Sequence, residues 1–309
     1  MCMKTRWRIP VCLLLCGLLF WFLADAAGVR VSMEEALSLC ARSVIPSLFP
    51  FMVVSSLLLS LGFGEWLSPW FAGWFDPLFR INGAGSSAFL LGLIGGYPIG
   101  AKTATELYQE HLVTREEAER LLAFCNNSNP VFLISVLGVG IFGSVRTGIW
   151  LWLIHLGSAL LTGLLFRGRG GRPSTRQHLP TPPAFHTVKL SSAFVSAVKS
   201  SLSGILSVCA FVIFFYTLAH PMAHLGRYAG PLLVGLTELF SLTPLLESTR
   251  FGFIAAAGIT GWGGLSVLCQ TAAVLDGSGL SPRICFWGKA IQGLLSAALA
   301  ALLATYILG

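Results

Sequence analysis

Charged side chains are scarce along this chain of 309 residues, and their scarcity decides the class of protein. Lys, Arg, Asp and Glu together make up 11% of the residues, whereas the AVILMFWYC set makes up 55%. An average soluble domain carries about 25% charged residues. So few charges cannot cover the surface of a soluble globule, and a mean hydropathy of +0.77 points the same way. The composition predicts an integral membrane protein.

Acidic residues are absent between Glu119 and Glu238, while basic residues continue through that stretch. Five of the basic residues fall within residues 167–190, which also hold four prolines. Loops rich in Lys and Arg beside apolar segments stay in the cytoplasm. We therefore expect residues 167–190 to be a basic cytoplasmic linker. Its basic residues are Arg167, Arg169, Arg172, Arg176 and Lys189.

The N-terminus repeats this pattern on a smaller scale. Lys4, Arg6 and Arg8 precede an apolar run that extends to about Ala27. A basic flank followed by an apolar run predicts a signal-anchor helix within residues 1–30, with the N-terminus in the cytoplasm. A cleaved signal peptide is the alternative, because residues 24–27 resemble a cleavage site.

Signatures of metal, redox and nucleic-acid chemistry are missing. None of the eight cysteines is paired as CxxC, so we expect neither a zinc site nor a disulfide framework. His220 and His224 lack the acid of an HExxH motif, and we expect no metal, no cofactor and no enzymatic activity. The net charge of +7 is explained by basic loops beside apolar segments, not by a nucleic-acid interface.

Several local patterns predict where helices begin and bend. Pro46 and Pro50 remove two backbone donors, which predicts a bend or break near them. The tryptophan-rich residues 62–82 suit an interfacial helix. Thr114 with Glu117 forms a capping-box pattern, and Ser281 before a proline is typical of a helix start.

The two halves of the chain share a motif order, which suggests an internal duplication. In each half a glycine-rich apolar run ending in an aromatic residue leads to a helix, then a turn, then an N-cap. Paired, interrupted apolar segments of this kind predict a binding site near the membrane midplane. The alternative is that the glycines only allow close helix packing. The matching positions are residues 92–97, Leu112 and Thr114 in the first half and residues 258–262, Leu280 and Ser281 in the second.

Four hydrogen-bonding side chains stand together in residues 126–129, between two apolar runs and directly before Pro130. Proline disfavours helical geometry in the preceding residue. Free backbone groups are costly in lipid unless protein, water or a solute satisfies them. This stretch is either an extramembrane turn or the break of a discontinuous helix that lines a polar cavity.

Ionisable residues inside apolar segments are functional candidates by default. Glu238 is isolated within such a segment and could bind a coupling proton, a coupling cation or a substrate donor. Lys102 and Arg250 could face an anionic substrate. His155 and Lys289 lie within predicted spans without a visible partner.

Three stretches carry a resemblance to a known family: GGYPIGAK at residues 95–102, RLLAFCNNSNP at 120–130 and GVGIFG at 138–143. With PSLFPF at 46–51, they are similar to the YlbJ-type sporulation integral membrane proteins. Those proteins contain the nucleoside-recognition, or Gate, domain, which is also found in FeoB iron transporters and is similar to the core of concentrative nucleoside transporters.

The resemblance implies an all-α polytopic membrane protein with two inverted repeats, each with a re-entrant hairpin and a discontinuous helix. The expected divisions are an anchor at 1–30, Gate-type repeats at 31–166 and 191–309, and the linker between them. The substrate-binding residues carried over by position are Gly96, Tyr97, Pro98, Lys102, Asn126, Asn127, Ser128, Asn129, Thr237, Glu238, Gly263, Gly264 and Gln270.

The resemblance also implies a function in endospore formation. We expect a transporter that works by alternating access, coupled to a proton or sodium ion, with movement of dipicolinate into the developing spore as the implied task. The expected setting is the cell membrane, as a multi-pass protein, with the outer forespore membrane as the narrower alternative. A non-transporting scaffold for other sporulation membrane proteins and a nucleoside transporter are the alternatives, and a homo-oligomer is compatible with each.

Overall fold

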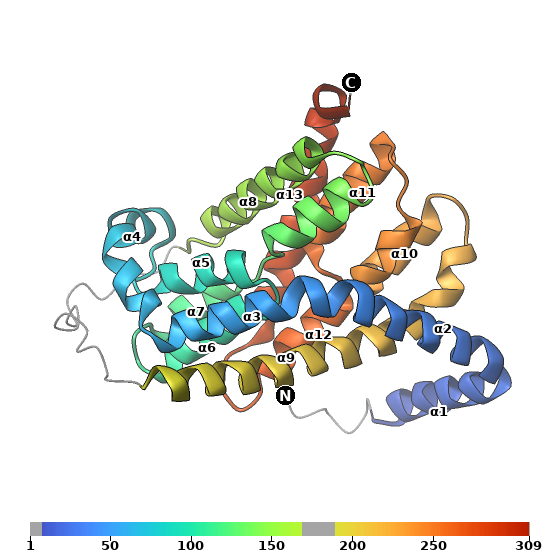
Figure 1. Ribbon diagram of the computed structural model, residues 1–309, viewed down its shortest axis with the longest axis horizontal. Helices are drawn as coiled ribbons and strands as arrows, with labels where there is room; N and C mark the ends of the chain where they lie inside the picture. The colour runs from blue at the N-terminus through green and yellow to red at the C-terminus, as the bar shows by residue number, and fades with distance from the viewer. Residues whose placement is uncertain (1–7, 169–188, 309) are drawn as a thin grey trace.

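The computed structural model describes residues 8–168 and 189–308, and the regular secondary structure of these residues is helical throughout (Figure 1). Lys4, Arg6 and most of the basic linker lie outside the described residues. Five described helical stretches are long and apolar enough to cross a membrane, which confirms the all-helical, polytopic class. They are Ala26–Leu58, Val145–Leu165, Leu190–His224, Arg250–Leu275 and Pro282–Leu308.

The chain begins with a short apolar helix and then a long helical path. Helix α1 covers Arg8–Ala24, and Asp25 caps α2 by accepting the Gly28 N–H at 3.2 Å. Helix α2 (Ala26–Leu39) continues through a π-helical turn, η2 (Cys40–Val44), into α3 (Ile45–Ser60). The distortion expected near Pro46 and Pro50 is not a break, because Pro50 lies inside α3. The distortion takes the form of the π-helical turn just before the first proline.

The tryptophan-rich segment forms α4 (Phe63–Phe79), as the sequence predicts. Trp66, Trp70 and Trp74 are exposed. An exposed aromatic face of this kind suits the interface between lipid and water.

The first half then forms a helical hairpin, α5 (Gly85–Gly95) and α6 (Ile99–Gln109), whose tip is at residues 96–98. The chain continues through α7 (Arg115–Leu122), a non-helical break at residues 126–129, and a second π-helical segment, η3 (Phe132–Val139). Helix α8 (Val145–Leu165) closes the half.

The second half contains a similar succession of helices and breaks. Helices α11 and α12 meet at Gly263, and a shorter break at Glu238 separates α10 from a 3-10 turn. The inverted relation of the two halves remains a prediction. The elements are α9 (Leu190–Ala219), η4 (His220–His224), α10 (Ala229–Thr237), η5 (Phe240–Leu245), α11 (Arg250–Trp262), α12 (Gly264–Leu275) and α13 (Pro282–Leu308).

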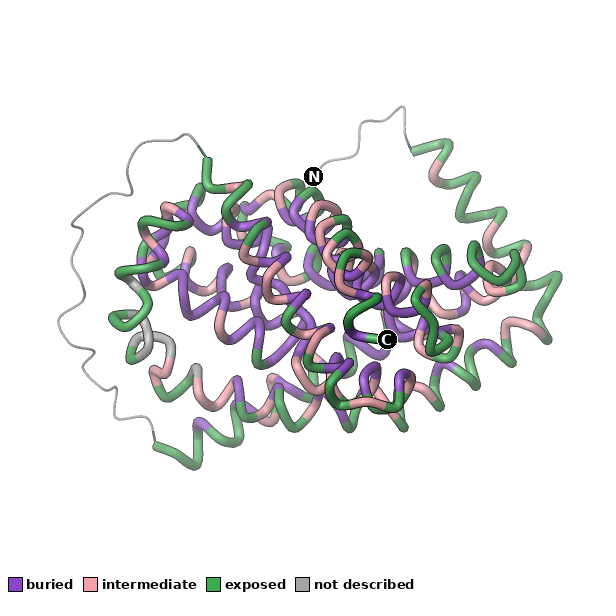
Figure 2. Tube along the Cα trace, turned by 90° about the horizontal axis from the view of Figure 1, so that it is seen from above, coloured by how far each residue is buried: buried purple, intermediate pink, exposed green. Residues whose placement is uncertain are grey.

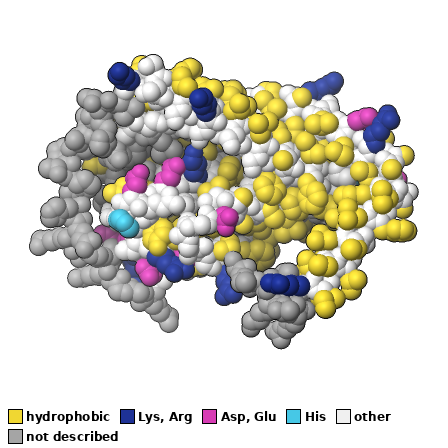
Figure 3. All heavy atoms as spheres, turned by 90° about the horizontal axis from the view of Figure 1, so that it is seen from below, with side chains coloured by type: hydrophobic (Ala, Val, Ile, Leu, Met, Phe, Trp, Pro, Cys, Tyr) yellow, Lys and Arg dark blue, Asp and Glu magenta, His cyan; other side chains and the backbone are white. Residues whose placement is uncertain are grey.

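The core lies where the two halves pack together. Helix α13 packs along α11 and α8, and α9 runs beside α2 and α3. Figure 2 shows buried residues concentrated in the middle of the molecule, while the outer helices are largely exposed. Hydrophobic side chains dominate a broad part of one face (Figure 3). An apolar exterior around a core that also buries polar side chains is expected when lipid is the solvent.

Candidate functional site

Glycines allow the first hairpin to lie directly against the break at residues 126–129. A Cβ atom at Gly92 or at Gly100 would overlap the backbone carbonyl oxygen of Cys125. Only glycine lets two backbones approach this closely. The glycine-rich character of the first half therefore brings α5 and α6 against the chain that enters the break.

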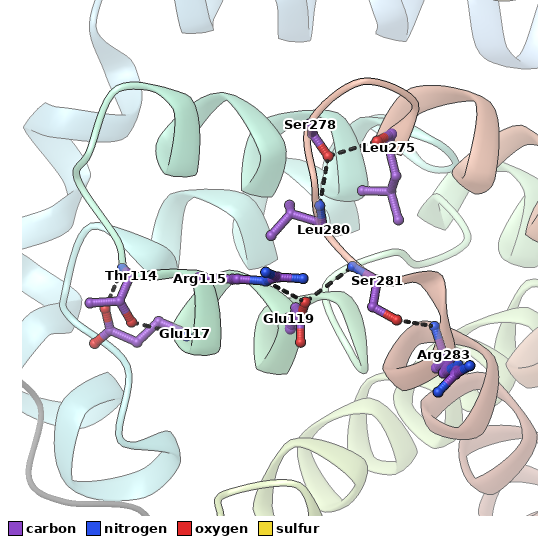
Figure 4. A network of polar contacts seen from close by, with 9 residues as sticks. All are labelled: Thr114, Arg115, Glu117, Glu119, Leu275, Ser278, Leu280, Ser281 and Arg283. Carbon is purple, nitrogen blue, oxygen red and sulfur yellow. Dashed lines mark hydrogen bonds and ion pairs between the residues drawn. The ribbon is translucent and has the colours of Figure 1, made fainter. Parts of the chain in front are cut away.

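Helix α7 carries the chain to the break and is fixed at its start by the predicted capping box (Figure 4). Glu117 accepts the Thr114 N–H at 2.8 Å, and Thr114 Oγ1 accepts the Glu117 N–H at 3.2 Å. The second oxygen of the Glu117 carboxylate accepts the Asn82 N–H at 2.9 Å. This buried carboxylate thus joins the start of α7 to the loop before α5.

Helix α7 is also joined to the second half. The Glu119 carboxylate accepts the Ser281 N–H at 3.1 Å, and Arg115 donates to the same oxygen at 3.1 Å (Figure 4). Ser281 immediately precedes α13, so one carboxylate sets the position of α13 relative to α7.

The four polar residues of the break are all buried, with exposed fractions of 3% or less. Asn126 donates from Nδ2 to Thr271 Oγ1 on α12 at 2.8 Å. Asn127 donates from Nδ2 to the Phe124 carbonyl at 2.7 Å. The Asn129 side-chain oxygen accepts the Phe132 N–H, at the start of η3, at 2.8 Å. The stretch therefore forms the break of a discontinuous helix inside the fold.

Two ionisable residues for which the sequence showed no partner have partners here, which corrects that expectation. His155 Nε2 accepts the Ser128 N–H at 3.1 Å. Lys289 Nζ donates to the Asn126 carbonyl at 3.0 Å, to Gln292 Oε1 at 2.7 Å and, more weakly, to Tyr97 Oη at 3.5 Å. Gln292 Nε2 in turn donates to Asn127 Oδ1 at 3.0 Å.

Lys289 is fully buried, and among the residues that the structure describes no carboxylate forms an ion pair with it. A buried charge is normally paired because its desolvation is costly. The Lys289 amino group is instead held by neutral oxygens.

Glu238 occupies the second break and is also fully buried. One carboxylate oxygen accepts the Ser241 backbone N–H at 2.5 Å and the Ser241 hydroxyl at 2.6 Å. The other oxygen has no hydrogen-bond partner among the residues that the structure describes. Leu242 is buried in the hydrophobic core beside this break.

The two hairpin tips and the second break lie side by side. Tyr97 donates from its hydroxyl to the Thr260 carbonyl on α11 at 2.7 Å. Gly263 and Gly264 have φ angles of 87° and 83°, which glycine adopts at little cost. A Cβ at Gly264 would lie 3.3 Å from the Glu238 Cα. Residues from both halves therefore surround one region.

A small cavity opens in this region, and its lining combines apolar side chains with a few polar ones. Two of the polar lining residues have an unused hydrogen-bonding atom: Asn129 Nδ2 and Gln270 Oε1. Buried polar atoms without a partner are rare, so each needs an explanation. The cavity is lined by Leu48, Gly96, Tyr97, Ser128, Asn129, Phe132, Val208, Leu239, Phe240, Val267 and Gln270.

The predicted site residues divide into three groups. Five of them line the cavity: Gly96, Tyr97, Ser128, Asn129 and Gln270. Six lie around it in the hairpin tips and breaks: Pro98, Asn126, Asn127, Glu238, Gly263 and Gly264.

Two predicted residues lie apart from the cavity lining. Lys102 is partly exposed and donates to Ser200 at 2.9 Å. Thr237 donates to the Leu233 carbonyl within its own helix at 2.8 Å. Arg250, the other proposed anion partner, is exposed and reaches the Ala301 carbonyl at 3.4 Å.

Sequence reasoning singled out Lys289 but did not recognise that Gln292 and Ser296 extend it into a polar stripe on α13. Lys289, Gln292 and Ser296 are all fully buried, and their spacing places them on one helix face. Ser296 meets Ser158 of α8 at 2.6 Å between hydroxyl oxygens. The sequence did contain a signal for this stripe, because the three polar residues are spaced three and four positions apart within an otherwise apolar span.

Comparison with known proteins found one family model and one related protein that match this chain. Residues 41–147, which include the first hairpin and its break, match the family model described as Gate: nucleoside recognition. The chain is 29% identical over 312 residues to the sporulation integral membrane protein YlbJ of Bacillus subtilis (strain 168). The similarity covers 87% of this chain and 76% of that protein. The resemblance is confirmed. No solved structure matches the chain.

Proposed function

We propose that this membrane protein is a secondary transporter of a small polar, anionic solute. The observation that carries the proposal is the pair of unused polar atoms, Asn129 Nδ2 and Gln270 Oε1, on residues that line one cavity. Asn129 belongs to the first half and Gln270 to the second. A donor and an acceptor that lack partners suit a solute that supplies the missing hydrogen bonds.

The charge around the cavity favours an anion. Lys289 is buried beside Tyr97, a lining residue, with its Nζ 5.1 Å from the ring centroid. Its charge is not neutralised by an ion pair in the described part of the chain. In a low-dielectric interior such a charge attracts an anion over several ångströms without touching it.

A ring contact between the two halves, at the cavity, supports alternating access. Phe132 of η3 and Phe240 of η5 meet edge to face, with ring centroids 4.9 Å apart, and both residues line the cavity. One ring comes from each half of the chain. Separation of the two rings would widen the cavity. We propose that rocking of the halves makes and breaks this contact during transport.

The similarity to YlbJ, a sporulation protein by name, supports endospore formation as the setting. We propose dipicolinate as the solute. Dipicolinate is planar, and its carboxylate accepts hydrogen bonds, which suits the Asn129 amide and the nearby lysine. In the singly protonated anion, the remaining carboxyl O–H can donate to Gln270 Oε1. We propose a location in the outer forespore membrane, with the N-terminus and the 167–190 loop in the cytoplasm.

The test is uptake of labelled dipicolinate and of uridine by vesicles reconstituted with the pure protein. We expect dipicolinate to accumulate above the level in protein-free vesicles, and faster with an imposed ion gradient. Accumulation of uridine instead would identify a nucleoside transporter. Failure of folded protein to move either solute, with no solute binding, would contradict the proposal and favour a Gate-type scaffold.

A further inference from the structure

The ammonium of Lys289 lies where oxygen atoms from three separate elements come together. The Asn126 carbonyl comes from the first break, Gln292 Oε1 from α13 and Tyr97 Oη from the first hairpin tip. All three are neutral oxygens, and the group that they surround is the buried amino group of Lys289.

Oxygen ligands at a helix break are the usual means by which transporters hold a coupling cation. Carbonyls of unwound backbone and the C-terminal ends of half-helices bind sodium ions or protons in such proteins. The Asn126 carbonyl has both properties, because it follows the end of α7 and lies in the break. A Gln oxygen and a phenol oxygen complete a set of hard ligands of the kind that small cations prefer.

Lys289 is not among the cavity-lining residues, so it does not serve as a direct solute contact. Its three N–H donors match the three surrounding oxygens. We propose that the Lys289 ammonium is a built-in cation that occupies a monovalent-cation site at the first break and makes sodium unnecessary. This inference rests on the proposed transport function and specifies its coupling: the sodium gradient is not used.

The consequence is that a side chain of α13 takes the place of a bound ion. A bound sodium ion links the elements around it only while the ion is present. Lys289 links α13, the break and the Tyr97 hairpin tip without any dependence on sodium concentration. Removal of its side chain leaves a gap lined by the same oxygens, and such a gap can accept a free cation.

The test compares melting temperatures of the purified full-length protein in sodium chloride and in choline chloride of equal ionic strength. We expect no sodium-specific change for the wild type. Lys289→Ala should gain a saturable, sodium-specific rise of several degrees. Adding Gln292→Ala to that variant should abolish the gain, because one oxygen ligand is lost. Lys199→Ala, which alters an exposed lysine on α9, should behave as the wild type.

Two results would overturn the inference: a saturable sodium-specific stabilisation of the wild type, or folded Lys289→Ala with no response to sodium. If Lys289→Ala does not fold, the dependence of wild-type uptake on sodium decides instead. Uptake that is equal in sodium and choline supports the built-in cation, and sodium-stimulated uptake contradicts it. The melting experiment needs no transport, so a wild type that moves no solute would refute the proposed function separately.

Discussion

The two helix breaks differ in where their hydrogen-bond partners come from. At the first break, Asn126, Asn127 and Ser128 bond to residues of α12, α13 and α8 that lie far away in the sequence. At the second break, the Glu238 carboxylate is held by Ser241, only three residues further along the chain.

This difference suggests different tasks for the two breaks. The first break connects the halves, so changes there should alter folding and solute binding together. At the second break, the hydrogen-bond partner of Glu238 lies on the same segment, and one carboxylate oxygen is unused among the described residues. A conservative change there should therefore alter function without altering folding.

The largest expected effect comes from a bulkier residue at the contact between the first hairpin and the first break. Gly100→Val should displace the Cys125 carbonyl, because the added side chain overlaps backbone that cannot move aside. We expect a loss of about 3 kcal/mol in the free energy of unfolding, at the upper end for overpacking. Chemical denaturation in detergent measures it. A stability equal to that of the wild type would refute the close approach.

Asn127→Ala tests the link between the first break and α13. The change leaves the buried Gln292 amide and the Phe124 carbonyl without their partner. We expect a loss of stability of about 1–3 kcal/mol, the cost of unpaired buried polar groups. Solute affinity should fall as well. Normal stability together with normal affinity would show that the first break does not connect the halves.

Glu238→Gln is the matching test of the second break. The amide keeps an oxygen for both Ser241 donors, so stability should change by less than about 1 kcal/mol. Uptake should be lost, because the amide can neither carry the charge nor exchange a proton. Melting and vesicle uptake are measured on the same preparation. Unchanged uptake would remove Glu238 from the site.

Lys102→Ala should have the smallest effect. Lys102 is partly exposed and makes a long ion pair with Glu106, with 3.8 Å between nitrogen and oxygen. Pairs of this kind contribute about 0–1 kcal/mol. We expect nearly normal stability and uptake. A severe loss of uptake with normal folding would place Lys102 on the solute path, as the resemblance alone implies.

The sequence predicted those features that depend on local patterns. The capping box at Thr114 and the start of α13 after Ser281 each follow from residues a few positions apart, whereas the helical hairpin at Gly96 was implied by the family resemblance. The break at residues 126–129 was also visible, because polar residues before a proline rarely continue a helix.

The partners of the buried ionisable residues could not be predicted in the same way. Lys289 meets residues more than 160 positions away in sequence, and no pattern within α13 identifies them. The bend or break predicted near the prolines of α3 is matched by a π-helical turn directly before them, and this turn lies against α9. The sequence does not reveal which kind of distortion the chain adopts.

Our central claim is that one solute site uses both halves of the chain. Direct binding of labelled dipicolinate to wild type, Asn129→Ala and Gln270→Ala tests it most simply. Each variant removes one unused polar atom from the cavity, from the first and second half respectively. We predict that each weakens binding about 5- to 150-fold, equivalent to 1–3 kcal/mol, in folded protein. Dipicolinate affinity unchanged in both variants would contradict the claim.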